Sequence, residues 1–135
     1  MKRIVLTLGL FLSGAAHAQN ARDHLTTCAT VANDAACQVS RQQFREQFPK
    51  AYRGDYQSQR NVAFCLRNGC DGSVSNNPTL ACAWRMVILL SGSSRVDGTD
   101  QGAFKIDCGR LDAAAMETAK AQATVIQAKI GQRGR

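Results

Sequence analysis

Six cysteines are the side chains in this 135-residue sequence whose number and spacing say most about chemistry. An even number of cysteines in a small chain that carries an export leader, described below, is typical of a disulfide framework. Free core thiols and a zinc site are the alternatives, but the sequence contains no Cys-x-x-Cys pair that would favour zinc. We expect local disulfides, one of which joins successive helices through Cys82 and Cys108. The candidates are Cys28, Cys37, Cys65, Cys70, Cys82 and Cys108.

No arrangement of side chains in the sequence predicts catalysis. Residues 91–94 read Ser-Gly-Ser-Ser, which lacks the Gly-x-Ser-x-Gly elbow of a nucleophilic serine. His24 would have no thiolate to activate if the cysteines are oxidised, and we expect it to be an exposed residue of a first helix. Asp97 and Asp100 lack the spacing and the closing glutamate of a calcium loop, so we expect turn and N-cap roles for them. The sequence therefore predicts a protein that is not an enzyme, with no catalytic residues, no metal ligands and no cofactor.

Arginines recur every seven residues at Arg53, Arg60 and Arg67, with Tyr56 near them. This spacing places the three arginines on one side of a helix. A solvated helix face is the ordinary interpretation of such a pattern. The functional interpretation is an anchor for an acidic protein partner, because arginine and tyrosine are enriched at interface hot spots. These four residues are the candidate partner-binding face.

The elements that must position these residues form a helix–turn–helix between Asp55 and Gly92. The first helix is predicted to begin near Asp55 and to end at Gly69. The second is predicted to have Asn77 as its N-cap and Pro78 at its first position, where the missing N–H costs nothing. Gly92 lies just past its end, where a left-handed residue closes a helix. This second helix is apolar on nearly all sides and is expected to be the most buried.

Within this stretch, Gly69, Gly72, Val74, Ala81 and Trp84 form a pattern that resembles one Sel1-like repeat, a relative of the tetratricopeptide repeat. The turn is two residues longer than in the usual Gly-x-Gly-Val pattern, and the resemblance covers residues 61–92, about a quarter of the chain. It implies an αα-hairpin used for protein contacts, and it implies no catalytic residues. Trp84 is expected to lie in the core.

Residues 1–18 have the pattern of a signal peptide. Lys2 and Arg3 precede an apolar core at 4–12, and Ala-His-Ala at 16–18 is the cleavage pattern. The remainder, residues 19–135, is expected to be a single helical domain that is periplasmic or secreted, without a further segment of membrane-span length. Removing Lys2 and Arg3 lowers the basic residues from 17 to 15, which against 10 acidic residues is a net charge of +5. This charge favours anionic partners, and for an exported protein nucleic acid is not expected among them.

The flanking segments are also predicted to be helical. Residues 20–33 are expected to form a short helix, and Ser40 is expected to cap a second one that ends or kinks at Pro49. Residues 103–108 are expected to form one or two turns. Asp112 is predicted to open a final helix that ends at Gly131 and packs an alanine seam against the Trp84 helix. The predicted fold is all-α, a compact array of about four to six helices stapled by disulfides.

The function predicted from these features is an exported, non-catalytic interaction module of the cell envelope, which binds or inhibits an envelope protein. One alternative is a small envelope hydrolase whose acidic residues the sequence does not reveal. Another is a basic protein that binds lipid or cell-wall polyanions, whose binding would weaken steeply with salt.

Overall fold

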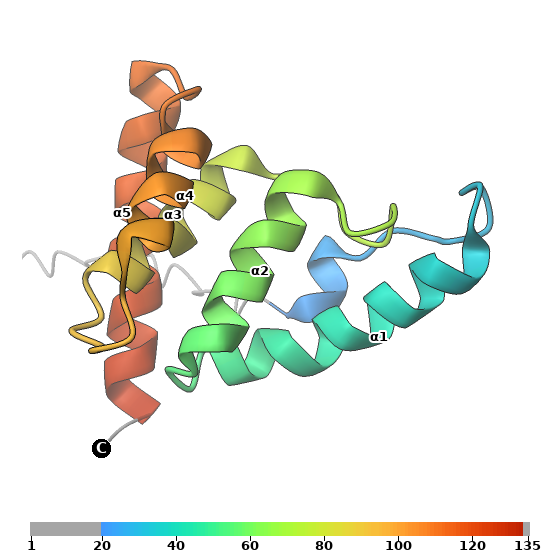
Figure 1. Cartoon of the computed structure of the whole chain (residues 1–135), viewed down its shortest axis with the longest axis horizontal. Helices are drawn as coiled ribbons and strands as arrows, with labels where there is room; N and C mark the ends of the chain where they lie inside the picture. The colour runs from blue at the N-terminus through green and yellow to red at the C-terminus, as the bar shows by residue number, and fades with distance from the viewer. Residues whose placement is uncertain (1–19, 134–135) are drawn as a thin grey trace, which may run out of the picture.

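The computed structural model describes residues 20–133, and the predicted leader at 1–18 lies outside these described residues. The described part is all-helical, as predicted, with a short 3-10 helix followed by α-helices (Figure 1). Their bounds are η1 Ala21–His24, α1 Asp34–Ala51, α2 Tyr56–Asn68, α3 Pro78–Leu89, α4 Gly98–Cys108 and α5 Ala113–Arg133. Between residues 20 and 133, no helix combines the length and the apolar character needed to cross a membrane.

The α2–α3 hairpin has the predicted start of both helices and the predicted end of α2, whereas α3 ends at Leu89 with Leu90 as its C-cap and is not closed by Gly92. The Asp55 side chain accepts a hydrogen bond from the Ser58 amide at 2.7 Å, and Gly69 closes α2 with a φ of 85°. The Asn77 side chain accepts a hydrogen bond from the Leu80 amide at 3.0 Å, and Pro78 opens α3. In each case the cap satisfies backbone groups that the helix itself leaves unpaired.

Helix α3 lies at the centre of the molecule and packs against α2, α4 and α5, while α1 packs against α2 and η1 (Figure 1). Trp84 is fully buried, which confirms that it is a core residue. A row of aromatic rings extends from α1 to it, with centroid distances of 5.4 Å between Phe44 and Phe48, 5.3 Å between Phe48 and Tyr52, and 5.0 Å between Tyr52 and Trp84. Ring pairs at these distances attract one another beyond the burial of their apolar area.

Helix α5 packs on α3 through a seam of small residues, as predicted. Asp112 caps it by accepting a hydrogen bond from the Ala115 amide at 2.8 Å, and Ala119 and Ala123 are buried. The predicted end at Gly131 is wrong, since α5 continues to Arg133. Glycine lowers helix stability without preventing helical backbone angles, so it does not by itself end a helix.

The N-terminal segment differs most from the prediction. Residues 20–33 do not form a helix beyond Ala21–His24, because the chain after His24 is extended and pairs with the turn between α2 and α3. Leu25 and Val74 form an isolated antiparallel bridge, and the Ser75 amide donates to the His24 carbonyl at 2.8 Å. Backbone hydrogen bonds to a distant segment have replaced those that a local helix would supply.

Three other predicted helix boundaries are also corrected. Helix α1 begins at Asp34 with Asn33 as its N-cap, so Ser40 lies inside the helix instead of opening it. Pro49 does not end α1, which continues to Ala51, so the expected helix end is wrong and the alternative, a kink, stays a prediction. A proline disfavours helical geometry at the residue before it without forbidding it. Helix α4 begins at Gly98, five residues before the predicted start, because Asp97 caps it.

Candidate functional site

Three disulfides join Cys28 to Cys37, Cys65 to Cys70 and Cys82 to Cys108, which confirms the predicted framework. Cys82 on α3 and Cys108 on α4 form the expected link between successive helices. No free cysteine occurs among the described residues. The four sulfurs of the first and third disulfides are buried, whereas Cys65 and Cys70 are half-buried. The Cys65–Cys70 disulfide is therefore the accessible one.

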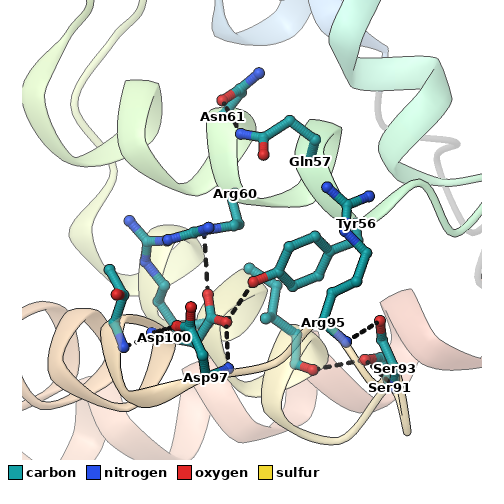
Figure 2. A network of polar contacts seen from close by, with 12 residues as sticks. Tyr56, Gln57, Arg60, Asn61, Ser91, Ser93, Arg95, Asp97 and Asp100 are labelled. Atoms are coloured by element: carbon teal, nitrogen blue, oxygen red, sulfur yellow. Dashed lines mark hydrogen bonds and ion pairs between the residues drawn. The ribbon is translucent and has the colours of Figure 1, made fainter.

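Helix α2 meets α4 through a buried carboxylate, Asp100 (Figure 2). The Arg60 Nε lies 3.2 Å from Asp100 Oδ1, and the Tyr56 hydroxyl donates a hydrogen bond to Oδ2 at 2.5 Å. The Asp97 amide also donates to Oδ2, at 3.1 Å, as half of the capping box that opens α4. Asp100 thus serves two purposes, because it closes the N-terminus of α4 and anchors that helix to α2.

A second buried carboxylate, Asp107, connects three helices. The Arg67 Nε of α2 lies 2.8 Å from Asp107 Oδ1, and the Arg85 Nε of α3 lies 2.7 Å from Oδ2. The side chains of Arg85 and Asp107 are only 7% and 1% exposed, whereas Arg67 remains 38% exposed. Asp107 therefore neutralises one of two guanidinium groups.

The structure brings together three of the four residues of the predicted partner-binding face. Tyr56, Arg60 and Arg67 all lie on α2 and turn toward the acids of α4. Arg53 precedes α2, is exposed, and does not line the groove described next. Whether this face contacts a partner is not tested by these contacts and stays a prediction.

Between α2 and α4 lies a groove of about 640 Å³ that combines arginines with exposed apolar side chains. Phe64 of α2 and Ile106 of α4 both line it, and each is 49% exposed. We call this the α2–α4 groove. Its lining residues are Gln57, Arg60, Asn61, Phe64, Arg67, Arg85, Thr99, Gly102, Ala103 and Ile106.

Phe64 also borders a second groove, of about 770 Å³, between α1 and α2. This one is lined mainly by polar side chains, among them Gln43 and Glu46, and by the accessible Cys65–Cys70 disulfide. The Ser40 hydroxyl of α1 donates a hydrogen bond to Asp71 Oδ2 at 2.5 Å across its end. The two grooves thus lie on either side of Phe64 and differ in charge and polarity.

The pKa values of several groups are shifted by their surroundings. Burial, followed by the hydrogen bond to Asp100, raises the pKa of Tyr56, and burial raises the pKa of Tyr52 to about 12. The hydrogen bonds from Ser58 lower the pKa of Asp55, and those from the amides of the first turn of α4 lower the pKa of Asp97. These pKa shifts result from helix caps and from packing, because each cause is a contact that also stabilises the fold.

His24 is not the exposed residue that the sequence predicts. It is half-buried, and its ring lies 5.2 Å from that of Phe48 and 6.3 Å from that of Phe44. Burial lowers the pKa of His24, and the neighbouring Asp23 opposes this only in part.

Within residues 20–133, no group of three or more histidine, cysteine, aspartate or glutamate side chains is placed to hold a metal ion.

The residues of the predicted hairpin motif have structural roles. Ala81 and Trp84 are fully buried in α3. A Cβ at Gly69 would lie 2.9 Å from the Asn76 side chain, and one at Gly72 would lie 2.7 Å from Val31 Cγ1, so both glycines permit close approaches. The likeness to a Sel1-like repeat itself stays a prediction. No family model matches the chain, and no curated protein or solved structure matches it.

The sequence interpretation missed Asp100, Asp107 and Arg85 as members of this site. A signal for the two acids was present, because Asp100 and Asp107 are spaced seven residues apart, like Arg60 and Arg67. Equal spacing on two helices allows one row of charges to pair with the other when the helices lie side by side. Nothing in the local sequence distinguishes Arg85 as buried except its place within an apolar helix.

Proposed function

We propose that this chain is an exported, non-catalytic protein-interaction module of the cell envelope, and that the α2–α4 groove is its docking face. Export to the periplasm or out of the cell is part of the proposal, and the leader pattern and the three disulfides support it. The expected consequence of docking is that an envelope protein is bound or inhibited.

The observation that carries the proposal is the position of Phe64 and Ile106. Both are large apolar side chains, both are about half exposed, and both line the same arginine-bearing groove. Apolar side chains exposed together in a concave surface with charged neighbours are typical of protein interaction sites. The expected partner presents an apolar anchor to this groove.

The walls of the groove are held in place by covalent and ionic links. The Cys82–Cys108 disulfide joins α3 to α4, and Asp100 and Asp107 tie α4 to the arginines of α2. A surface that is already ordered loses less conformational freedom when a partner binds. This rigidity supports docking of a preformed face, and the α2–α3 hairpin, which we propose to be Sel1-like, supplies one of its walls.

The charges beside the groove support a binding role over hydrolysis. Asp100 and Asp107 are buried, and each carboxylate is held by at least one arginine. Burial and pairing with arginine make these two carboxylates less accessible to a substrate than an exposed acid would be. The three arginines that contact these two aspartates are Arg60, Arg67 and Arg85, so one positive charge is left over. This surplus favours an acidic partner.

Affinity capture from an envelope extract tests the proposal when matched variants of the oxidised protein are compared. Phe64→Ala/Ile106→Ala removes the two apolar side chains of the groove. Val39→Ala/Val125→Ala removes two exposed apolar side chains that lie outside it. We expect one discrete protein to be retained by the wild type and by the control, and to be lost by the groove variant.

The captured protein is then purified and its affinity is measured by calorimetry. We expect the groove variant to weaken binding by about tenfold or more, equivalent to about 1.4 kcal/mol, while the control leaves the affinity unchanged. Equal retention by all three proteins would contradict the proposal. Retention of salt-sensitive polyanions alone would favour the polyanion-binding alternative.

A further inference from the structure

We infer that Arg67 and Arg85 form a carboxylate-binding site in the α2–α4 groove, and that it holds an aspartate or glutamate side chain of the partner protein. The inference rests on the proposed function, because it specifies the chemistry of the partner segment that docks in the same groove.

The first support is the charge balance around Asp107. Arg67 Nε lies 2.8 Å from Oδ1 in an ion pair, and Arg85 Nε donates a hydrogen bond to Oδ2 at 2.7 Å, so each carboxylate oxygen faces one guanidinium group. Two guanidinium groups share one carboxylate, which leaves one positive charge without a counter-ion. Arg85, whose side chain is only 7% exposed, is already paired with Asp107, so the surplus charge belongs to Arg67, which is 38% exposed and lines the groove. A second carboxylate would neutralise that charge.

The second support is the set of donors that remain. A guanidinium group has N–H donors on Nε and on both terminal nitrogens. Arg67 and Arg85 use their Nε atoms for Asp107, and within residues 20–133 their terminal nitrogens make no hydrogen bond. Both arginines line the groove. The terminal nitrogens can therefore hold an incoming carboxylate through the paired hydrogen bonds that guanidinium groups form with planar anions.

The other end of the groove differs. Asp100 contacts one arginine, Arg60, and also accepts hydrogen bonds from the Tyr56 hydroxyl and the Asp97 amide (Figure 2). Arg95 lies over the Tyr56 ring and Asp97 opens α4 at the same end, so two arginines and two aspartates balance there. The positive surplus is therefore located at the Arg67–Arg85 end and is not spread along the groove.

The apolar side chains identify the occupant as a protein segment. Phe64 lies three residues before Arg67 on α2, a spacing that places both on one side of the helix, and Ile106 of α4 lines the same groove. A free phosphate would use the guanidinium groups and leave both apolar side chains uncovered. A segment with an acidic residue next to leucine-sized residues would contact both, which is the composition we assign to the partner.

The test is a titration followed in the side-chain NMR signals of the folded, oxidised protein. The probes are the blocked peptide acetyl-Leu-Glu-Leu-amide, its neutral counterpart acetyl-Leu-Gln-Leu-amide, and inorganic phosphate. We expect the acidic peptide to shift the Nε–H signals of Arg67 and Arg85 and the methyl signals of Ile106. The neutral peptide should bind at least about tenfold more weakly, because it cannot supply the charge.

Two charge-matched variants complete the test. Arg67→Gln removes one side of the site but leaves Arg85 to pair with Asp107, and its thermal unfolding midpoint verifies that it folds. Arg53→Gln removes the same charge outside the groove. We expect Arg67→Gln to weaken binding of the acidic peptide by about tenfold or more and Arg53→Gln to leave it unchanged.

Three results would overturn the inference: equal binding of the acidic and neutral peptides, equal weakening by the two variants, or tighter binding of phosphate at the same arginines. Capture of the partner separates this inference from the proposed function. A partner that depends on Phe64 and Ile106 but binds Arg67→Gln as tightly as the wild type would overturn the carboxylate site and leave the proposed function standing. Absence of any partner, with the acidic peptide bound at Arg67 and Arg85, would overturn the proposed function and support the carboxylate site.

Discussion

Arg85 of α3 and Asp107 of α4, 22 residues apart in the chain, form an ion pair with 2.7 Å between Nε and Oδ2 that is nearly sealed from solvent. Arg67 of α2 contacts the other oxygen of the same carboxylate. Three helices therefore meet at one aspartate. An arrangement of this kind is sensitive to the loss of the shared partner, because the remaining charge is left buried.

Replacing Asp107 by asparagine is expected to lower the free energy of unfolding by roughly 3 to 5 kcal/mol, since Arg85 would stay buried without a counter-charge. Urea unfolding followed by circular dichroism measures the change. The control is Glu117→Gln, which removes an exposed ion pair to Lys120 of the same 2.7 Å length and is expected to cost about 1 kcal/mol or less. Equal losses for the two variants would show that burial of the Asp107 pair has no energetic effect.

The two tyrosines of the chain are expected to ionise late in the folded protein. Burial raises the pKa of Tyr52 to about 12, and burial together with Asp100 raises the pKa of Tyr56 above its usual 10.0. Spectrophotometric titration of phenolate should therefore show less ionisation at pH 10 in the native state than in denaturant. A native titration that matches the denatured one would contradict the burial of both rings.

The same pKa shifts predict how stability depends on alkaline pH. The folded state favours the neutral phenol, so this contribution is fully present below the unfolded pKa of 10.0 and is lost as the pH rises toward about 12. The thermal unfolding midpoint of the wild type should fall over that pH range. The midpoint of Tyr52→Phe should fall less steeply, because the substituted ring cannot ionise. If the midpoints of the two proteins fell equally with pH, the loss of stability would not come from ionisation of Tyr52.

The Cys65–Cys70 disulfide is expected to be reduced before the other two, because only its cysteines are half-buried. Thiol–disulfide exchange requires a thiolate to reach a sulfur atom, and burial prevents this. Graded dithiothreitol treatment, alkylation and peptide mass spectrometry should detect a species with only these two thiols free, while the added dithiol is oxidised. Earlier reduction of Cys28–Cys37, or simultaneous reduction of all three, would contradict the predicted order.

Trp84→Ala is expected to destabilise the protein by roughly 3 to 5 kcal/mol, because it empties a fully buried site that Tyr52 contacts edge-on at 5.0 Å. The comparison is Val125→Ala on the exposed side of α5, expected to change stability by about 0.5 kcal/mol or less. Differential scanning calorimetry of both variants measures the difference. An unchanged midpoint for Trp84→Ala would be incompatible with its place in the core.

Much of this fold was predictable because its helix boundaries depend on neighbouring residues. Asp55, Asn77 and Asp112 cap their helices through amides only three residues away, and Gly69 ends α2 by adopting a backbone angle that other residues disfavour. Interactions of such short range are present whatever the rest of the chain does. The even number of cysteines similarly predicted disulfides without any knowledge of the fold.

Tertiary structure decided the features that depend on distant segments. The segment after His24 is extended because residues 73–75 supply its hydrogen bonds, which no local pattern could reveal. Arg60 and Arg67 appeared in the sequence as a face open to solvent, yet α2 and α4 both pack on α3, which brings Asp100 and Asp107 to these arginines. The pairing of charges across helices is set by how apolar surfaces pack, since that packing determines which rows of side chains meet. Local residues thus determined where α2, α3 and α5 begin and where α2 ends, and long-range packing determined where the N-terminal helix stops and which charges are neutralised.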